Sequence, residues 1–190
     1  MASSAPAAPA TPPATAVVSR RWVTLALLSI VCALSYIDRQ VLTVLMEVIK
    51  QDLKLSDTVL GLLSGASFAI FYVVAGFPIA RYADRGDRRL VIAVCVSIWS
   101  AATALCGLAQ NAWQMAFARI FVASGEAGAG PASYSLVTEI FPKDRRVLVI
   151  GVLLAANSVG LSAGLALTGW LAQYFSWRWV FVIVGLPGLL

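Results

Sequence analysis

Long apolar segments, separated by short charged connections, follow one another from residue 21 to residue 190. They predict helices at about 21–48, 57–82, 88–109, 113–140, 146–173 and from 177 onward. Most of these segments exceed the roughly 20 residues that an α-helix needs to cross the hydrocarbon core of a bilayer. Since 60% of the residues are hydrophobic and only 12% are charged, a soluble domain is excluded. The sequence therefore predicts an all-α membrane protein that has the lipid bilayer as its partner.

The two ends of the chain differ from the apolar segments between them. Residues 1–19 hold four of the eight prolines and no charge, so they are predicted to form a disordered, Ala/Pro-rich tail, with residues 20–190 as a helical bundle. The last segment covers only 14 residues from Trp177 to Leu190, about 21 Å of helix against about 30 Å of hydrocarbon. We therefore expect the native chain to continue beyond Leu190.

The distribution of Lys and Arg predicts how the segments are oriented. If the N-terminus is cytoplasmic, nine basic residues fall on the cytoplasmic side and three, Lys50, Lys54 and Arg178, on the other. The nine are Arg20, Arg21, Arg81, Arg85, Arg88, Arg89, Lys143, Arg145 and Arg146. This asymmetry is what the positive-inside rule requires of a multi-pass protein of the inner (plasma) membrane. The net charge of +5 then reflects topology, and no nucleic-acid partner is expected.

The residues give no support to an enzymatic function. The segment Gly160–Gly164 (GLSAG) matches a hydrolase nucleophile pattern, but the chain has no histidine to serve as the base. We interpret Gly160 and Gly164 as a face of small residues that lets two helices approach closely, a role that Gly61 and Gly65 could also have. The three cysteines lack metal-ligand spacing, so no metal site is predicted. We likewise predict no catalytic residues and no cofactors.

The connection between the second and third segments, GFPIARYADRGDRRL, carries a recognisable motif. It resembles the cytoplasmic loop signature G-x-x-x-D-R-x-G-R-R of the major facilitator superfamily, with Asp84, Arg85, Arg88 and Arg89 at the matching positions. Asp87 stands where the family often has glycine, and the neighbouring Gly86 could supply the tight turn instead. The resemblance implies that this loop latches the cytoplasmic side of a transporter in its closed state.

A narrower resemblance comes from residues 36–42, 106–146 and 177–190, which are similar to the spinster-like branch of that superfamily. The resemblance implies the N-terminal half of a twelve-helix transporter, built from six helices as two three-helix inverted repeats. It also implies alternating access, with the C-terminal half of the same chain as a partner that this sequence lacks.

Four charged residues lie within the apolar segments: Asp38 and Arg39 in the first, and Arg119 and Glu126 in the fourth. A charge in hydrocarbon costs several kcal/mol unless it has a partner. Arg119 and Glu126 are two helical turns apart, and Asp38 and Arg39 point about 100° apart, so neither pair can bond within its own helix. Because the resemblance implies that the first and fourth helices face each other, we expect Arg39 to pair with Glu126, and Asp38 with Arg119 or a water molecule.

Together with the resemblance to a transporter superfamily, these charges predict secondary active transport of a small amphipathic or anionic solute, with protons as the coupling ion. In the absence of histidine, Asp38 or Glu126 would carry the proton, while an arginine would bind the headgroup. Three alternatives remain open: proton-coupled multidrug efflux, a receptor or structural subunit without flux, and an ionic link that merely joins two helices.

Overall fold

The computed structural model describes residues 14–189, with side-chain burial described from Arg20 onward. The helices are α1 (Ala14–Asp52), α2 (Asp57–Gly61), α3 (Ser67–Arg85), α4 (Arg88–Cys106), α5 (Ala112–Ile140), α6 (Arg146–Tyr174) and α7 (Trp177–Gly185). A π-helical turn, η1 (Leu62–Ala66), joins α2 to α3, and short 3₁₀ turns, η2 (Lys143–Arg145) and η3 (Leu186–Leu189), precede α6 and follow α7. The part of the chain that the structure describes contains no strand, which confirms the all-α prediction.

The predicted helix ranges agree with the structure to within a few residues, except at the start of α1. Residues 14–19 are helical, so the prediction of a disordered tail is wrong for its last six residues. Their sequence, ATAVVS, follows the last proline of the tail, Pro13, and nothing in it interrupts a helix. The prediction for residues 1–13 lies outside the described residues.

Four of the described helical segments are long and apolar enough to cross a membrane by length and composition: 20–52, 57–85, 88–106 and 143–174. Helix α5 has 29 residues but is not among the four, although the sequence predicts it as a span. It carries Arg119 and Glu126, and its many glycines and serines further lower its mean hydropathy. The segment Trp177–Leu189 is apolar but shorter than the four.

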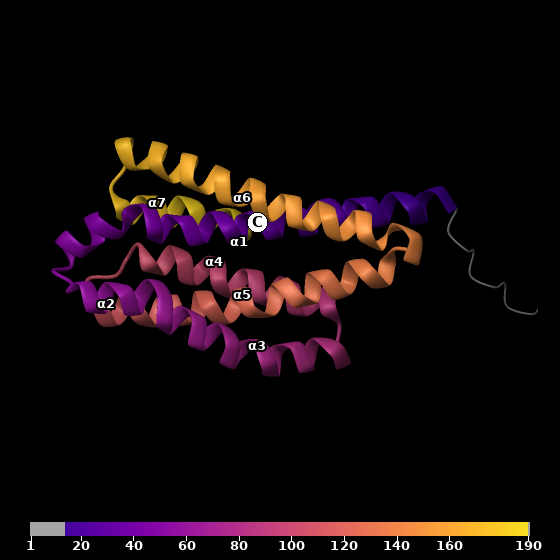
Figure 1. Cartoon of the computed structure of the whole chain (residues 1–190), viewed down its shortest axis with the longest axis horizontal. Coiled ribbons are helices and arrows are strands. Elements are labelled where there is room, and N and C mark those ends of the chain that lie inside the picture. The colour runs from indigo at the N-terminus through magenta and orange to yellow at the C-terminus, as the bar shows by residue number, and fades with distance from the viewer. Residues whose placement is uncertain (1–13, 190) are drawn as a thin grey trace, which may run out of the picture.

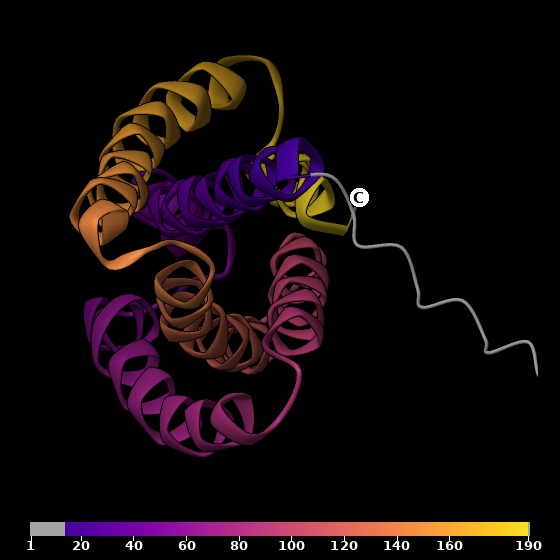
Figure 2. The ribbon, with the colours of Figure 1, turned by 90° about the vertical axis from the view of Figure 1, so that its right-hand side faces the viewer.

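The helices pack as two related groups of three. The first group is α1, α2–η1–α3 and α4, and the second is α5, α6 and α7; corresponding members run in opposite directions along the long axis (Figure 1). Helix α1 packs mainly against α6, and its counterpart α5 packs against α3, the counterpart of α6 (Figure 2). Helices α4 and α7, which correspond to each other, are also in contact. This pattern is that of two inverted three-helix repeats, as predicted.

Two glycines of α6 allow the close contact with α1. A Cβ atom at Gly160 would lie 2.4 Å from the carbonyl oxygen of Ala33, and one at Gly164 would lie 2.8 Å from Cα of Ile37. The interpretation of this pair as a helix-packing face is therefore confirmed. Among residues 14–189, no such contact is made by Gly61 or Gly65, because a Cβ atom at either position has no neighbour within 4 Å.

We expect Gly160→Ala to push α6 away from α1 and destabilise the protein by about 1–3 kcal/mol, the usual range for overpacking. The obstacle is backbone and cannot move aside as a flexible side chain would. Gly151→Ala on the same helix is the matched control, since nothing lies within 4 Å of its added Cβ and alanine favours a helix by about 1 kcal/mol. Melting temperatures in detergent should fall for the first variant only; equal melting temperatures would contradict the assignment.

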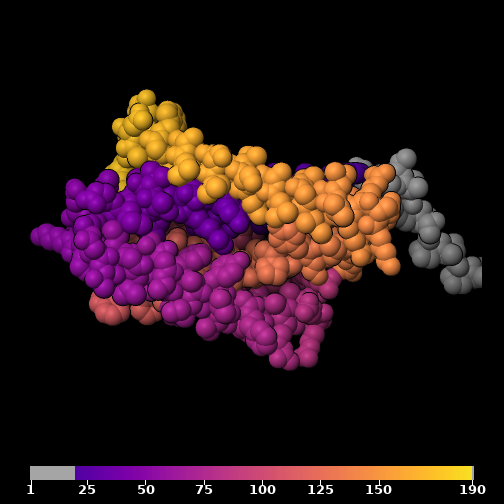
Figure 3. All heavy atoms as spheres, viewed as in Figure 1, coloured from indigo at the N-terminus to yellow at the C-terminus, as the bar shows by residue number. Residues whose placement is uncertain are grey.

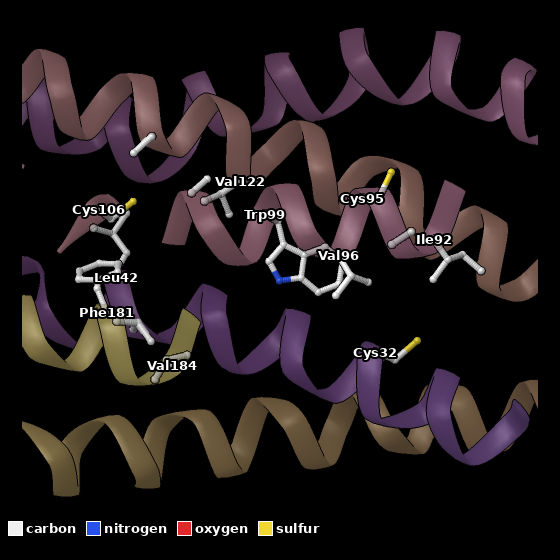
Figure 4. Packing of buried hydrophobic residues seen from close by; sticks show 14 of the residues in the cluster. Cys32, Leu42, Ile92, Cys95, Val96, Trp99, Cys106, Val122, Phe181 and Val184 are labelled. Carbon is white, nitrogen blue, oxygen red and sulfur yellow. The ribbon is translucent and has the colours of Figure 1, made fainter. Parts of the chain in front are cut away.

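Much of the surface of the bundle is apolar, unlike that of a water-soluble protein. Helix α4 contributes nine buried residues, and Trp99 lies among them within the apolar cluster of Figure 4. In contrast, α3 turns large apolar side chains such as Val73 and Phe77 outward, where they are 70% and 67% exposed. In the space-filling view, α3 and α6 flank the visible face, with α1 and α5 between them (Figure 3). Apolar outer surfaces suit a lipid solvent.

At the end of the bundle away from Arg20, a polar network joins three helices. The Asp52 carboxylate at the end of α1 accepts hydrogen bonds from Trp177 Nε1 at 3.1 Å and from Arg178 Nη2 at 2.9 Å. Arg178 also donates to the carbonyl oxygen of Ala109, which follows α4. The network therefore holds the ends of α1, α4 and α7 together.

Candidate functional site

The cross-helix pair predicted between α1 and α5 is present. Nε of Arg39 donates a hydrogen bond to Oε2 of Glu126 over 2.6 Å. The Glu126 side chain is fully buried, whereas that of Arg39 is 32% exposed. The guanidinium of Arg39 also lies 5.3 Å from the ring centroids of Tyr36 and Tyr72. An arginine that is held by a carboxylate and by aromatic faces, yet remains partly accessible, is suited to bind an anion.

The second predicted pair is more deeply buried and less tightly joined. Nη1 of Arg119 lies 3.9 Å from Oδ2 of Asp38, an ion-pair distance that is too long for a direct hydrogen bond. The two side chains are only 6% and 3% exposed. Within the described residues, Asp38 Oδ2, Arg119 Nε and Arg119 Nη1 have no hydrogen-bond partner. This pair is therefore enclosed in the bundle.

A cavity of about 210 Å³ lies beside one of the two pairs. Arg39 and Glu126 line it, but Asp38 and Arg119 do not. The remaining wall is largely aromatic and polar and includes Tyr36, Tyr72, Trp99, Tyr134, Ser133 and Asn157. Asn157 Nδ2 donates to the hydroxyl oxygen of Tyr134 over 3.3 Å, which links α6 to α5 across the cavity. Of the four charges, only Arg39 and Glu126 are exposed to this cavity.

Sequence reasoning missed the aromatic and amide residues of this wall. A signal existed: Tyr36, Tyr72 and Tyr134 lie within apolar segments rather than at their ends, where membrane proteins usually place tyrosine. Trp99 is likewise far from the predicted interfaces. An aromatic residue with a polar group at mid-depth needs a hydrogen-bonding or ligand-binding environment, and here that environment is the cavity.

The predicted latch residues lie together between α3 and α4, beside the end of α5. Asp84, Arg85 and Arg89 are exposed, and Arg88 forms an ion pair with Glu139 of α5. No hydrogen bond or ion pair joins Asp84 to another residue in the described part of the chain. The loop therefore leaves a carboxylate and two guanidinium groups available at this end of the bundle.

The turn within this loop does not need the conformational freedom of glycine. Gly86 has φ of −112° and Asp87 has φ of −76°, and neither value lies in the left-handed region. A Cβ atom at Gly86 would, however, lie 3.2 Å from the carbonyl oxygen of Tyr82. Asp87 instead caps α4, because its Oδ1 accepts a hydrogen bond of 2.9 Å from the backbone N–H of Arg89. Gly86 lies in the turn as expected, although without a positive φ, and the departure at Asp87 is explained by capping.

Among residues 14–189, no cluster of three or more His, Cys, Asp or Glu side chains could hold a metal ion. Cys32, Cys95 and Cys106 are each buried and free, as expected of small apolar residues in a core.

A bundle of inverted three-helix repeats with buried charges around a cavity at mid-depth is the architecture of one half of a secondary transporter. The sequence model of the Major Facilitator Superfamily matches residues 28–190. The chain belongs to this superfamily, and it is a multi-pass membrane protein.

Similarities to individual proteins narrow the position of the chain within this superfamily. It is 42% identical over 166 residues to an MFS-type efflux pump of Mycolicibacterium smegmatis, covering 87% of this chain and 39% of the relative. It is 29% identical to the D-galactonate transporter of Escherichia coli O6:H1, covering 90% of this chain and 40% of that protein. The crystal structure of a bacterial homologue of the human lysosomal transporter spinster, inward-facing and unoccupied, matches with a TM-score of 0.77 and 36% identity over 89% of this chain and 41% of that one.

These similarities support the predicted spinster-like branch, and the relatives are named as transporters rather than enzymes. The chain spans about two fifths of the length of the relatives described above.

Proposed function

We propose that the full-length protein is a proton-coupled secondary transporter of small amphipathic or anionic solutes, working by alternating access in the plasma membrane with its N-terminus in the cytoplasm. The observation that carries the proposal is the Arg39–Glu126 pair on the wall of the cavity. Arg39 binds the anionic group of the solute, and Glu126 carries the proton. Asp38 and Arg119 support this pair from behind.

The geometry suggests how the solute and the proton are coupled. Glu126 Oε2 is held by Arg39, while its Oε1 is buried without a described partner. When a solute anion takes the guanidinium of Arg39, Glu126 is left as a buried carboxylate without its counter-ion. Such a carboxylate is stabilised by taking up a proton. Solute and proton thus enter the same state of the transporter, which is the requirement for symport.

The test is uptake by the full-length protein in proteoliposomes with an imposed pH gradient. The first panel should contain sugar-acid anions, because one relative is named for D-galactonate, together with single-chain amphiphiles that carry an anionic headgroup. Accumulation that follows the gradient, and collapses when a protonophore is added, is the expected result. Solute movement that ignores the pH gradient for every member of the panel would refute the proton coupling.

Efflux is the second candidate function, and the observation that favours it is the 42% identity to an efflux pump. The aromatic wall of the cavity suits flat, hydrophobic solutes as well as amphiphiles. Efflux predicts exchange of outward-moving solute for inward-moving protons. Everted vesicles with an acidic lumen would take up cationic and neutral dyes added outside under this function, whereas the symporter would not take them up.

Asp84 is proposed to latch the cytoplasmic side together with Arg85, Arg88 and Arg89. We expect Asp84→Asn to shift the balance between inward-open and outward-open states by about 1–2 kcal/mol, which is about tenfold in population. The reason is that a contact made in only one state changes the relative free energy of the two. Asp87→Asn is the control from the same loop, since asparagine caps a helix as well as aspartate does. Cysteine accessibility from both membrane faces measures the shift. Unchanged accessibility would show that the loop is a solvated basic segment without a latch role.

A further inference from the structure

One aromatic ring is a neighbour of both buried arginines. The centroid of the Phe68 ring lies 5.3 Å from Cζ of Arg39 and 4.9 Å from Cζ of Arg119. Both distances are within the range of a cation–π contact. Phe68 belongs to α3, whereas the arginines belong to α1 and α5, so its ring joins three helices at the site. It is half-buried and packs on the apolar core.

An irregularity in the chain lies directly before this ring. The π-helical turn Leu62–Ala66 ends two residues ahead of Phe68. A π-helical turn contains an extra residue, so it changes the face on which the residues on either side of it are presented. Phe68 is stacked on Tyr72, one helical turn further along, with ring centroids 6.0 Å apart and an angle of 29° between the planes. Both rings therefore present their faces toward Arg39.

The four charges at this site pair only across helices. Asp38 and Arg39 point about 100° apart, and Arg119 and Glu126 are two helical turns apart, so neither helix can pair its own charges. In the structure each arginine pairs with one carboxylate from the facing helix. Phe68 cannot replace a carboxylate, but its π-face attracts each guanidinium and fixes its position. Since both arginines contact it, the ring holds each guanidinium beside its own carboxylate.

We propose that Phe68 is a positioning residue that holds both guanidinium groups in place, that of Arg39 on Glu126 in the cavity and that of Arg119 on Asp38 behind it. This inference rests on the proposed function, because the position of Arg39 affects transport only if solute and proton act on the cavity pair. The other charged or titratable groups around that pair are Asp38 on α1, Arg119 on α5, and Tyr36, Tyr72 and Tyr134 on α1, α3 and α5. Among the described residues, α4 and α6 contribute Trp99 and Asn157, without charge, and Cys32 of α1 completes the titratable lining.

The test compares Phe68→Leu, which keeps an apolar side chain but removes the π-face, with Phe68→Tyr, which keeps the face. For Phe68→Leu we expect the midpoint of the pH profile of uptake to move about one unit toward higher pH, as suits the loss of one cation–π contact at a desolvated site. The direction follows because Arg39 then holds Glu126 less firmly, so Glu126 accepts a proton more readily. Phe68→Tyr should restore the profile, and Phe121→Leu, on the exposed surface of α5, should leave it unchanged.

A normal profile in a folded Phe68→Leu variant would overturn the proposal, as would a Phe68→Tyr variant displaced as far as Phe68→Leu. If uptake by the unmodified protein does not depend on pH, the result refutes the proposed proton coupling and leaves the role of the Phe68 ring to a second test. The ring is then tested by melting temperatures of Phe68→Leu, Arg39→Ala and the double variant. Effects that fall short of additivity support contact between the two side chains. Strictly additive effects refute the positioning role.

Discussion

Glu126→Gln is expected to abolish the coupling of transport to the proton gradient while downhill exchange of solute continues. Glutamine keeps the shape of the side chain and can still accept a hydrogen bond from Arg39, but it cannot take up a proton. A gradient of one pH unit can drive about tenfold accumulation when one proton moves with each solute, and the variant should show none. The measurement is uptake in proteoliposomes with and without an imposed pH gradient, beside solute exchange at equal pH.

Two comparisons make this result specific to Glu126. Glu139→Gln changes a carboxylate of the same helix that is exposed and pairs with Arg88, so proton-driven accumulation should continue. Asp38→Asn tests the other buried acid, which does not line the cavity, and should reduce the rate without removing the response to the gradient. If Glu126→Gln still concentrates the solute against its gradient, the proton is carried elsewhere, and a loss in Asp38→Asn would point to that residue.

Arg39→Ala is expected to have the largest effect on both binding and stability. It removes the cation that meets the solute and leaves Glu126 buried without its partner, a loss of about 3 kcal/mol. This figure is at the low end for buried pairs because Arg39 is 32% exposed. Arg39→Lys keeps the charge but loses the planar donor geometry and the stacking on aromatic rings, so the KM for an anionic solute should rise while the protein remains stable.

The double variant Arg39→Ala with Glu126→Ala separates a working site from a structural link between α1 and α5. If the pair only joins the helices, each single variant lowers the melting temperature, and the double variant recovers both stability and transport. If the pair binds solute and proton, the double variant recovers stability but not transport. A stable double variant that transports with full proton coupling would show that the pair is structural.

Hydrophobic pattern and charge were sufficient to predict the helices and their order. Long apolar segments can satisfy their backbone groups in lipid only by forming helices, so composition and local sequence determine this level of structure. The buried charges could also be identified from the sequence. Charged residues stand out in apolar segments because each is costly without a partner, as are Asp38, Arg39, Arg119 and Glu126. Their pairing followed from the helical period together with the resemblance to the major facilitator superfamily, which places the first and fourth helices face to face.

The tertiary structure decided which of these residues share a cavity. Arg39 and Asp38 are adjacent in sequence, yet only Arg39 lines the cavity, because successive residues on a helix point in different directions and meet different neighbours. Gly160 packs against α1 and Gly61 packs against nothing described, although both lie in similar small-residue patterns. The π-helical turn before Phe68 has no signature in the apolar pattern, and neither does the contact of that ring with two arginines from other helices. The helices follow from the local sequence, whereas the cavity depends on how α1, α3, α4, α5 and α6 pack together.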